Sequence, residues 1–204
     1  MDVLITRSVG LRGTAILARE YRSELLSRYP ERLVDTAASF DKDMDKHNDT
    51  SVISDIFTNM NDVYGIAYAK EYTEFGVYEA LFQASKELKC GMRIRIKDIP
   101  IRQETVEISE FTEVNPYELY SGLSMVIVAE NARALKEYLL KEFNIPSSIV
   151  AYTTPDNDKI ISNDEEEGFL PHIRKDELKN KLGRKLYYER TDSVNLREEQ
   201  QDRD

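Results

Sequence analysis

The segment before the clearest helical pattern of the chain combines groups that could act on a ligand. An ammonium group, a carboxylate, a hydroxyl and a flexible backbone position occur close together, at Lys70, Glu71, Thr73 and Gly76. At the start of a helix such groups could bind a phosphate or polarise a substrate. Ordinary helix capping also accounts for part of the pattern, with Thr73 as the N-cap and Glu74 in the first turn. The spacing leaves both interpretations open.

Two glycines, Gly10 and Gly13, follow the first apolar run and precede a helical pattern. A turn of this kind can present backbone N–H groups to an anion at the start of a helix. Glycines in a tight turn also serve backbone conformation alone. The chain contains neither a Gly-x-x-x-x-Gly-Lys-Ser/Thr loop nor a Gly-x-Gly-x-x-Gly turn, so neither common nucleotide cradle is predicted.

A short basic stripe runs along a predicted strand and its exit, at Arg93, Arg95, Lys97 and Arg102. Basic and apolar residues alternate over residues 92–97, which is typical of a strand with one solvated face. The stripe is therefore either that solvated face or a site for a small anion or an acidic protein.

No metal site is predicted. The alternating aspartates between residues 41 and 49 resemble a calcium loop, but Lys46 stands where the loop needs glycine and Val52 where it needs glutamate. One cysteine and two histidines are too few for the usual zinc sites, and a single cysteine excludes an internal disulfide. Cys90 ends an apolar helical pattern and is interpreted as a packing residue.

The charge balance of the 204-residue chain limits its partners. Asp and Glu total 38 against 28 Lys and Arg, which gives a formal net charge of −10. Such a charge repels nucleic acids and anionic membranes, so we expect neither as a partner. No apolar run approaches the ~20 residues of a membrane span, and the N-terminal region lacks the basic residues of a signal peptide. The sequence predicts a cytoplasmic protein.

Apolar periodicity predicts an α/β or α+β fold with helices covering a mixed sheet. The expected strands are residues 2–6, 92–96, 124–129 and 148–153, followed by a hairpin at 159–162 and 168–170. The expected helices are residues 14–29, 31–40, 54–60, 74–89, 103–111, 131–143 and 175–182. We expect Thr14 to cap the first helix and Gly91 to end the fourth.

The apolar pattern and the local composition also predict the domain organisation. Residues 1–183 contain no linker and no internal repeat, so we expect one domain. Residues 184–204 are acidic, poor in apolar side chains and without periodicity, so we expect a disordered tail.

Several strings of residues carry a resemblance that covers the chain up to the tail. They are Leu-Arg-Gly-Thr-Ala-Ile-Leu-Ala at 11–18, Ile-Pro-Ile-Arg-Gln-Glu-Thr at 99–105, Asn-Pro-Tyr at 115–117 and Ser-Gly-Leu-Ser-Met at 121–125. In this order they resemble the C-terminal domain of the aminoimidazole ribonucleotide (AIR) synthetase-related, or PurM-like, family. The branch they resemble most is that of the hydrogenase expression/formation protein HypE.

The resemblance implies one half of an ATP-dependent synthetase or dehydratase. In the family an N-terminal domain binds ATP with Mg²⁺, and the C-terminal α/β domain closes over the active cleft, where an amide or related oxygen is activated. The ATP-binding domain is absent from these 204 residues. We therefore expect this chain to hold no cofactor and to be inactive alone, and to associate with a separate ATP-binding domain or with itself.

On the same resemblance, Lys70 and Glu71 are the candidate catalytic residues. The candidate ligand-binding residues are Thr73, Gly76, Arg102, Glu104, Gly10 and Gly13.

The site departs from the family pattern. The family's turn His-Asp-x-Thr-x-Gly-Gly corresponds to residues 70–76, where Thr73 and Gly76 match and Glu71 replaces the aspartate. Lys70 replaces a histidine that would titrate near neutrality. These departures favour a second hypothesis, a non-catalytic regulatory or scaffold module that keeps the fold. A third hypothesis is a small-anion sensor on the basic strand around Arg95.

Overall fold

The computed structural model describes residues 1–42, 49–72, 75–122, 124–173 and 177–183. Within these residues seven strands form one sheet, in the order β2-β4-β1-β5-β3-β6-β7. Neighbouring strands are antiparallel, except that β3 and β6 run parallel. The strands are β1 (Asp2–Thr6), β2 (Ile66–Tyr72), β3 (Gly91–Arg95), β4 (Ser124–Ala129), β5 (Ser147–Thr154), β6 (Lys159–Ser162) and β7 (Glu167–Phe169).

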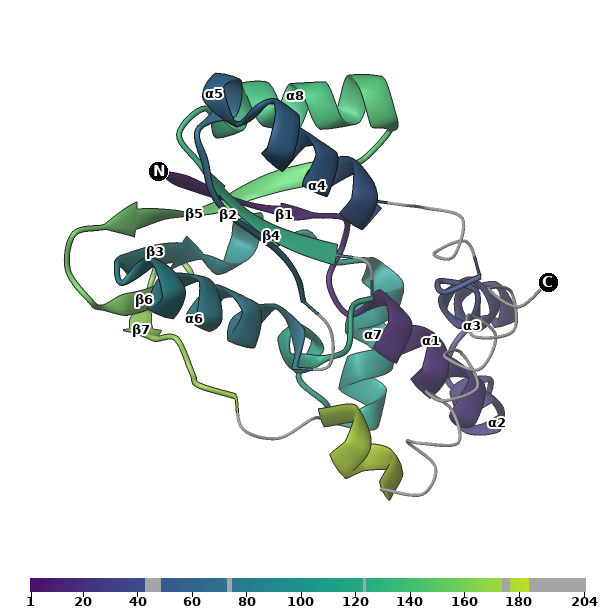
Figure 1. The fold of residues 1–204 in the computed structure, drawn as a ribbon. Helices are drawn as coiled ribbons and strands as arrows, with labels where there is room; N and C mark the ends of the chain where they lie inside the picture. The colour runs from purple at the N-terminus through teal and green to yellow at the C-terminus, as the bar shows by residue number, and fades with distance from the viewer. Residues whose placement is uncertain (43–48, 73–74, 123, 174–176, 184–204) are drawn as a thin grey trace.

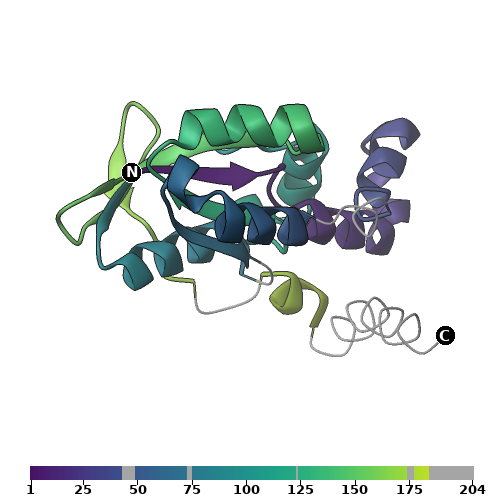
Figure 2. The same cartoon turned by 45° about the horizontal axis from the view of Figure 1, so that its top comes forward.

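Helices cover both faces of the sheet and one of its ends. Helices α4 and α8 lie on one face and α6 on the other, whereas α1, α2, α3 and α7 gather beyond the end of the sheet where β1 finishes (Figures 1 and 2). The helices are α1 (Leu11–Glu20), α2 (Arg22–Leu25), α3 (Glu31–Ala38), α4 (Asp49–Asn59), α5 (Asn61–Tyr64), α6 (Gly76–Leu88), α7 (Gln103–Thr112) and α8 (Ala132–Phe143). Two short 3₁₀ helices, η2 (Ile96–Asp98) and η3 (Pro116–Glu118), flank α7, and residues 177–183 form a last helix.

The two faces of the sheet bury separate apolar clusters. In β1, Val3 and Ile5 pack on the α6 side, whereas Leu4 packs beneath α4 and α8. This alternation is that of a strand with two covered faces. All six residues of β4 are buried. Continuous apolar runs such as Ser124–Ala129 are therefore central strands of the sheet.

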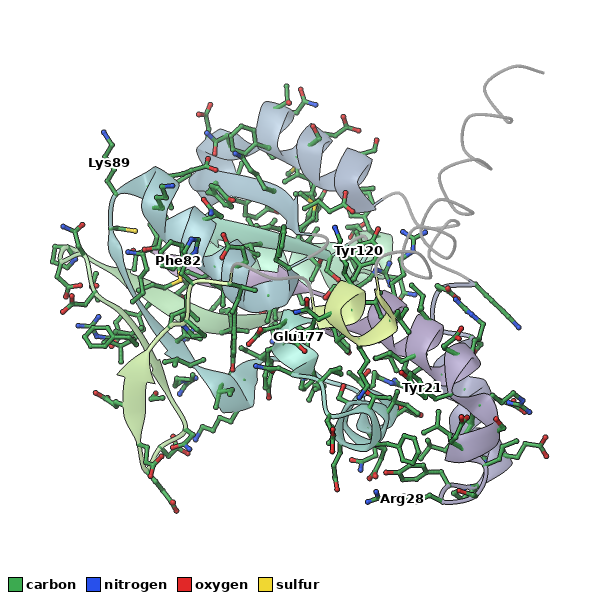
Figure 3. All side chains as sticks on the ribbon, turned by 90° about the horizontal axis from the view of Figure 1, so that it is seen from below. Tyr21, Arg28, Phe82, Lys89, Tyr120 and Glu177 are labelled. Atoms are coloured by element: carbon green, nitrogen blue, oxygen red, sulfur yellow. The ribbon has the colours of Figure 1, made fainter. Side chains whose placement is uncertain are left out.

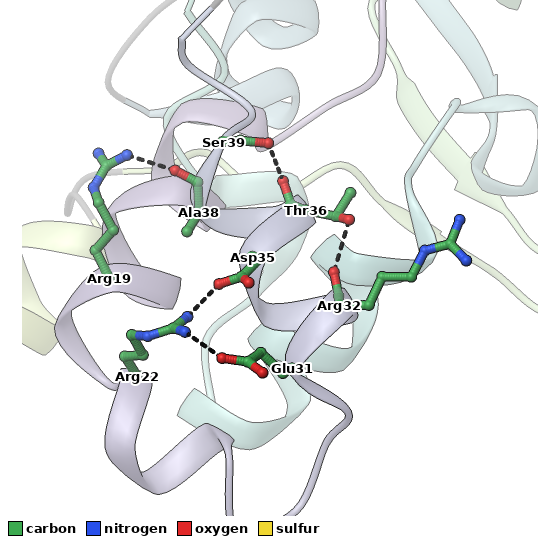
Figure 4. A network of polar contacts seen from close by, with 8 residues as sticks. All are labelled: Arg19, Arg22, Glu31, Arg32, Asp35, Thr36, Ala38 and Ser39. Atoms are coloured by element: carbon green, nitrogen blue, oxygen red, sulfur yellow. Dashed lines mark hydrogen bonds and ion pairs between the residues drawn. The ribbon is translucent and has the colours of Figure 1, made fainter.

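A third apolar cluster joins the helices at the end of the sheet. It includes residues of α1, α3 and α7, together with Leu178 and Leu182 of the last helix. Ion pairs lie on the surface of this cluster: Arg22 donates to Asp35 at 2.5 Å and to Glu31 at 3.2 Å (Figure 4). Because these charged groups are exposed, they contribute at most about 1 kcal/mol each. Burial of the apolar residues therefore holds this corner together.

A carboxylate ties the segment after β7 to α6. Oε2 of Glu79 accepts the backbone N–H of Ile173 at 3.1 Å and lies 3.1 Å from Nδ1 of His172. The ring of His172 stacks on Phe82, with centroids 4.5 Å apart, and Phe82 is labelled on α6 in Figure 3. The Glu79 side chain is 13% exposed and that of His172 is 40% exposed, so the carboxylate is shielded from water better than the imidazole.

The predicted mixed α/β fold is confirmed, with three local corrections. Residues 66–72 form the edge strand β2, which is absent from the predicted strands. Helix α1 begins at Leu11, and Thr14 lies inside it, donating its hydroxyl to the carbonyl of Gly10 at 2.7 Å. Helix α6 ends at Leu88, its C-cap Lys89 adopts the left-handed conformation, and Gly91 begins β3.

Some predictions fall outside the described residues. They concern Thr73, the aspartates between 43 and 48 and the tail at 184–204. In the part of the chain that the structure does describe, no helix has the length and apolar character needed to cross a membrane.

Candidate functional site

A groove of about 340 Å³ lies where α4 meets β2 and β4. Its described walls are Ser54 and Phe57 from α4, Ala69, Lys70 and Glu71 from β2, and Met125 from β4. A volume of this order suits a small organic molecule. The groove contains the two candidate catalytic residues, so we treat it as the candidate site.

Lys70 and Glu71 point to opposite faces of β2. In the antiparallel ladder Lys70 pairs with Val126, which packs on the α6 side, and Glu71 pairs with Met125, which packs beneath α4. Directly paired residues of a ladder share a face of the sheet. The carboxylate of Glu71 therefore lies on the groove side with Met125, whereas the ammonium of Lys70 does not.

The ammonium of Lys70 is held by a carboxylate on α6. Its Nζ donates to both carboxylate oxygens of Glu87, at 2.8 and 2.7 Å, and lies 5.6 Å from the ring centroid of Tyr68. Burial raises the pKa of Tyr68 to about 12, and the charge of Glu87 adds to this rise. Tyr68 is therefore a neutral phenol at physiological pH and cannot serve as a base there.

The backbone N–H groups of Gly10, Arg12 and Gly13 at the start of α1 already have acceptors. Gly10 donates to the Ser121 hydroxyl at 2.8 Å, and the N–H of Gly13 donates to the carbonyl of Tyr120 at 2.7 Å. The N–H of Arg12 donates to the carbonyl of Ser121 at 3.3 Å. These donors hold the loop before β4, so the structure gives Gly10 and Gly13 a conformational role.

Gly76 permits a close approach between two parts of the backbone. Its φ is +68°, and a Cβ atom there would lie 2.4 Å from the carbonyl oxygen of Tyr117 and 2.7 Å from the Cα of Glu118. Only glycine fits such a position without strain. The space beside its Cα is filled by η3, and Tyr117 in turn stacks on Tyr78, with centroids 5.1 Å apart.

Glu118, in η3, is a titratable residue that is absent from the predicted site residues. Burial and the nearby charge of Glu177 raise the pKa of its carboxyl, while a hydrogen bond donated by Nδ2 of Asn115 at 2.7 Å lowers it. Glu177 lies on the last helix, labelled in Figure 3. The pair of carboxylates is separated by 59 residues in sequence, 177 minus 118, so no local pattern could reveal it.

Arg102 and Glu104 lie together at the start of α7. Nε of Arg102 is 3.5 Å from Oε2 of Glu104, and its guanidinium lies 5.7 Å from the ring centroid of Phe40. Neither residue is among the described walls of the groove. Arg102 and Glu104 therefore contact each other and do not line the groove together with Lys70 and Glu71.

The basic strand residues each have an acidic neighbour. Arg93 pairs with Asp156 at 3.2 Å, Lys97 with Asp164 at 2.5 Å, and Arg95 with Asp98. This pairing favours the solvated-face interpretation of the stripe over the small-anion site.

Metal and thiol chemistry find little support in the described residues. Within them, no three His, Cys, Asp or Glu side chains are grouped so that they could hold a metal ion. Cys90 is partly buried, and this burial raises the pKa of its thiol. The thiolate needed for nucleophilic attack is thereby disfavoured.

Comparison with known proteins gives structural matches only. Neither a family model nor a curated protein matches the chain. The hydrogenase maturation protein HypE in complex with ATP matches with a TM-score of 0.61 and 14% identity, over 87% of this chain and 52% of that chain. A HypE–HypF complex matches with a TM-score of 0.59 and 18% identity, over 83% of this chain and 52% of that chain.

Thiamine monophosphate kinase from Aquifex aeolicus has the same arrangement, with a TM-score of 0.51 and 11% identity over 82% of this chain and 51% of that chain. The chain thus spans about half the length of each protein that it matches. At such identities the likeness establishes the fold alone. The chain has the PurM-like mixed α/β fold that is shared by HypE and thiamine monophosphate kinase.

Proposed function

We propose that this chain is one half of an AIR synthetase-related ATP-dependent enzyme and works with a separate ATP-binding domain. The observation that supports this most directly is the match to HypE in complex with ATP, which takes in 87% of this chain but 52% of that one. A partner equivalent to the other half of HypE would supply the nucleotide site. The HypE–HypF complex shows that HypE assembles with another protein, and we infer a protein partner for this chain too.

The described residues fit poorly to a bound nucleotide. Phosphates are usually held by free backbone N–H groups at a helix start or by unpaired cations. Here the N–H groups of Gly10 and Gly13 bond to the loop before β4, and the ammonium of Lys70 bonds to Glu87. We therefore place ATP and its Mg²⁺ on the partner domain, where they would supply the phosphoryl group.

In this proposal the groove faces the partner domain. Glu71 would contact the substrate, while Lys70 could turn toward it only by leaving Glu87. Thr73, Gly76, Arg102 and Glu104 would border the completed site, with Gly76 fixing the path of the chain into α6. We place the complex in the cytoplasm.

The test is calorimetric titration of the purified, folded chain with Mg-ATP. We expect no heat of binding from the chain alone. The same titration is then repeated after adding a family ATP-binding domain from the same genome, where we expect saturable binding and a complex that elutes as one species. Saturable Mg-ATP binding to the chain alone would overturn the proposal.

The second candidate is a non-catalytic module, and a specific contact favours it. The family's histidine position carries Lys70, whose ammonium is neutralised by Glu87 and faces away from the groove. A complex that forms with the ATP-binding domain, binds nucleotide and releases no ADP would support this candidate. Release of ADP that depends on Glu71 would support the enzyme instead.

A further inference from the structure

One half of the sheet has a face that no described helix covers. Helix α8 lies over β1 and β5, and no described side chain of β3, β6 or β7 belongs to the apolar cluster beneath α4 and α8. In Figure 1, α8 lies at the top of the molecule, whereas β6 and β7 lie at the lower left. We infer that this open face of β3, β6 and β7 packs against the same face of a second copy of the chain.

The strand registers show which side chains lie on the open face. Met92 and Ile94 of β3 and Ile161 of β6 pack on the α6 side, so the residues that alternate with them point to the other side. They form two rows of residues that are paired across neighbouring strands. The first row is Arg93, Ile160 and Phe169, and the second is Arg95, Ser162 and Glu167.

Aromatic side chains on this face are open to solvent. Phe169 is 75% exposed, more than any other large apolar side chain that the structure describes. Tyr152 of β5, which pairs with Arg93 in the β3–β5 ladder, is 52% exposed. Exposed aromatic rings beside arginine are typical of protein interfaces. Covering Phe169 would therefore supply the apolar part of a contact between two copies.

The two rows are complementary to themselves about a two-fold axis. Because β6 lies between β3 and β7, an axis that runs along β6 between the two copies places β3 of one copy over β7 of the other. Arg95 then faces Glu167 of the second copy, and Arg93 faces the ring of Phe169 of the second copy. Ile160 faces its own counterpart at the centre. The symmetry repeats each contact, which gives two ion pairs and two cation–π contacts around an apolar centre.

The acidic neighbours of the two arginines are compatible with this arrangement. Arg95 pairs with Asp98, and Arg93 pairs with Asp156. A guanidinium carries five N–H donors, so it can bind a second carboxylate or lie against a ring while it keeps its first partner. The side chain of Arg95 is 59% exposed, which leaves it accessible to Glu167 of the second copy. No ion pair of the single chain has to break.

The open face is small and lies far from the groove. It offers fewer residues than the about 20–30 that each partner contributes to a standard interface, so we expect a weak dimer with a dissociation constant in the micromolar range. Strands β7 and β2 are the two opposite edges of the sheet, so the groove beside β2 stays uncovered in this dimer. The inference therefore does not depend on the proposed ATP-binding partner.

Sedimentation equilibrium of the full chain, over low to high micromolar concentrations, tests the inference. We expect a reversible monomer–dimer equilibrium. Phe169→Ser should weaken the dimer at least about tenfold, because two exposed rings, one from each copy, lose their apolar contact. The ring is exposed in the single chain, so the variant should stay folded, and circular dichroism verifies this.

A charge exchange tests the predicted pairing of the two copies. Arg95→Glu and Glu167→Lys each place like charges opposite one another twice, so each variant alone should dimerise about tenfold more weakly. In an equimolar mixture the unchanged Glu167 of the first variant faces the unchanged Arg95 of the second, and the two introduced groups also attract each other. We expect the mixture to dimerise nearly as well as the parent. Asp55→Lys, on the exposed surface of α4, changes the net charge as Glu167→Lys does and should leave dimerisation unaltered.

Three outcomes would overturn the inference. They are a chain that stays monomeric over the whole concentration range, a dimer that Phe169→Ser leaves unchanged, and a mixture of the two charge variants that associates no better than either alone. None of them involves a nucleotide, so each leaves the proposed ATP-binding partner standing. Saturable Mg-ATP binding to the chain alone would overturn that proposal without affecting the dimer.

Discussion

The ammonium of Lys70 lies between the two carboxylate oxygens of Glu87, at 2.8 and 2.7 Å, on the side of β2 opposite to the groove. This pair joins the edge strand of the sheet to α6. It also separates Lys70 from its sequence neighbour Glu71, with which it was expected to form a site. Any catalytic use of Lys70 requires that this pair be broken.

The Lys70–Glu87 pair should be weak. Both side chains are about half exposed, at 56% and 45%, and such pairs contribute less than about 1 kcal/mol. We expect a double-mutant cycle with Lys70→Met and Glu87→Gln, measured by urea unfolding, to give a coupling energy below that value. A coupling well above it would show that Lys70 is locked on α6 and is not available for chemistry.

Gly76→Ala should destabilise the fold. The new Cβ would meet the backbone of η3 at 2.4 Å, and the positive φ adds strain, so we expect a loss of more than about 1 kcal/mol. Gly168→Ala is the control, because nothing lies within 4 Å of its added Cβ. Urea denaturation of both variants checks the prediction, and similar midpoints for the two would contradict it.

Glu118→Gln should stabilise the protein at neutral pH. Because burial raises the pKa of Glu118 in the folded state, the fold favours the protonated form, and that advantage is present at acidic pH and lost as the pH rises through the raised pKa. Glutamine mimics the protonated form at every pH. Thermal melts should therefore show a higher Tm for the variant at pH 7 and a smaller difference below pH ~4, the region of the unfolded pKa.

The raised pKa of Glu118 would be contradicted if Glu118→Gln were less stable than the parent at pH 7. It would also be contradicted if the difference in Tm between variant and parent did not change with pH. Glu177→Gln offers a second measurement. It removes the neighbouring charge that contributes to the raised pKa, so it should stabilise the protein in the same direction by a smaller amount.

Glu79→Ala should release the segment after β7. The substitution leaves the backbone N–H of Ile173 without its acceptor and removes the partner of His172, for an expected loss of about 1–3 kcal/mol. Hydrogen exchange at the Ile173 amide should accelerate. Glu87→Ala on the same helix removes an equal charge from an exposed pair and should leave that amide protected; equal exchange in both variants would show that Glu79 does not hold the segment.

The main elements could be predicted where they were strongly patterned. The continuous apolar run at 124–129 predicted β4 to the residue, and the helical pattern at 74–89 predicted α6 to within two residues. Strand β2 was missed because it lies at the edge of the sheet and is interrupted by the exposed charges of Lys70 and Glu71. The order of the strands in the sheet depends on pairing between distant segments, which a local apolar pattern does not predict.

The candidate site was predictable only in part. Lys70 and Glu71 were recognised from their types, but their separation onto two faces follows from the strand that was not predicted. Glu79 and Glu118 were not recognised because their partners, His172 and Glu177, lie far along the sequence. Gly10 and Gly76 were predicted as site residues. The backbone and side-chain atoms that leave no room for a Cβ at these two positions come mainly from the loop around η3.

The position of β1 in the sheet has a consequence for biosynthesis. This strand leaves the ribosome before the other six, yet it sits between β4 and β5, which begin at Ser124 and Ser147. Its hydrogen-bonding edges stay unsatisfied until both later strands have emerged, because sheets with distant pairings close late. At about 5–20 residues per second the wait is on the order of ten seconds or more. The nascent chain therefore passes through a long interval in which an apolar, unpaired strand is open to chaperones or to another copy of itself.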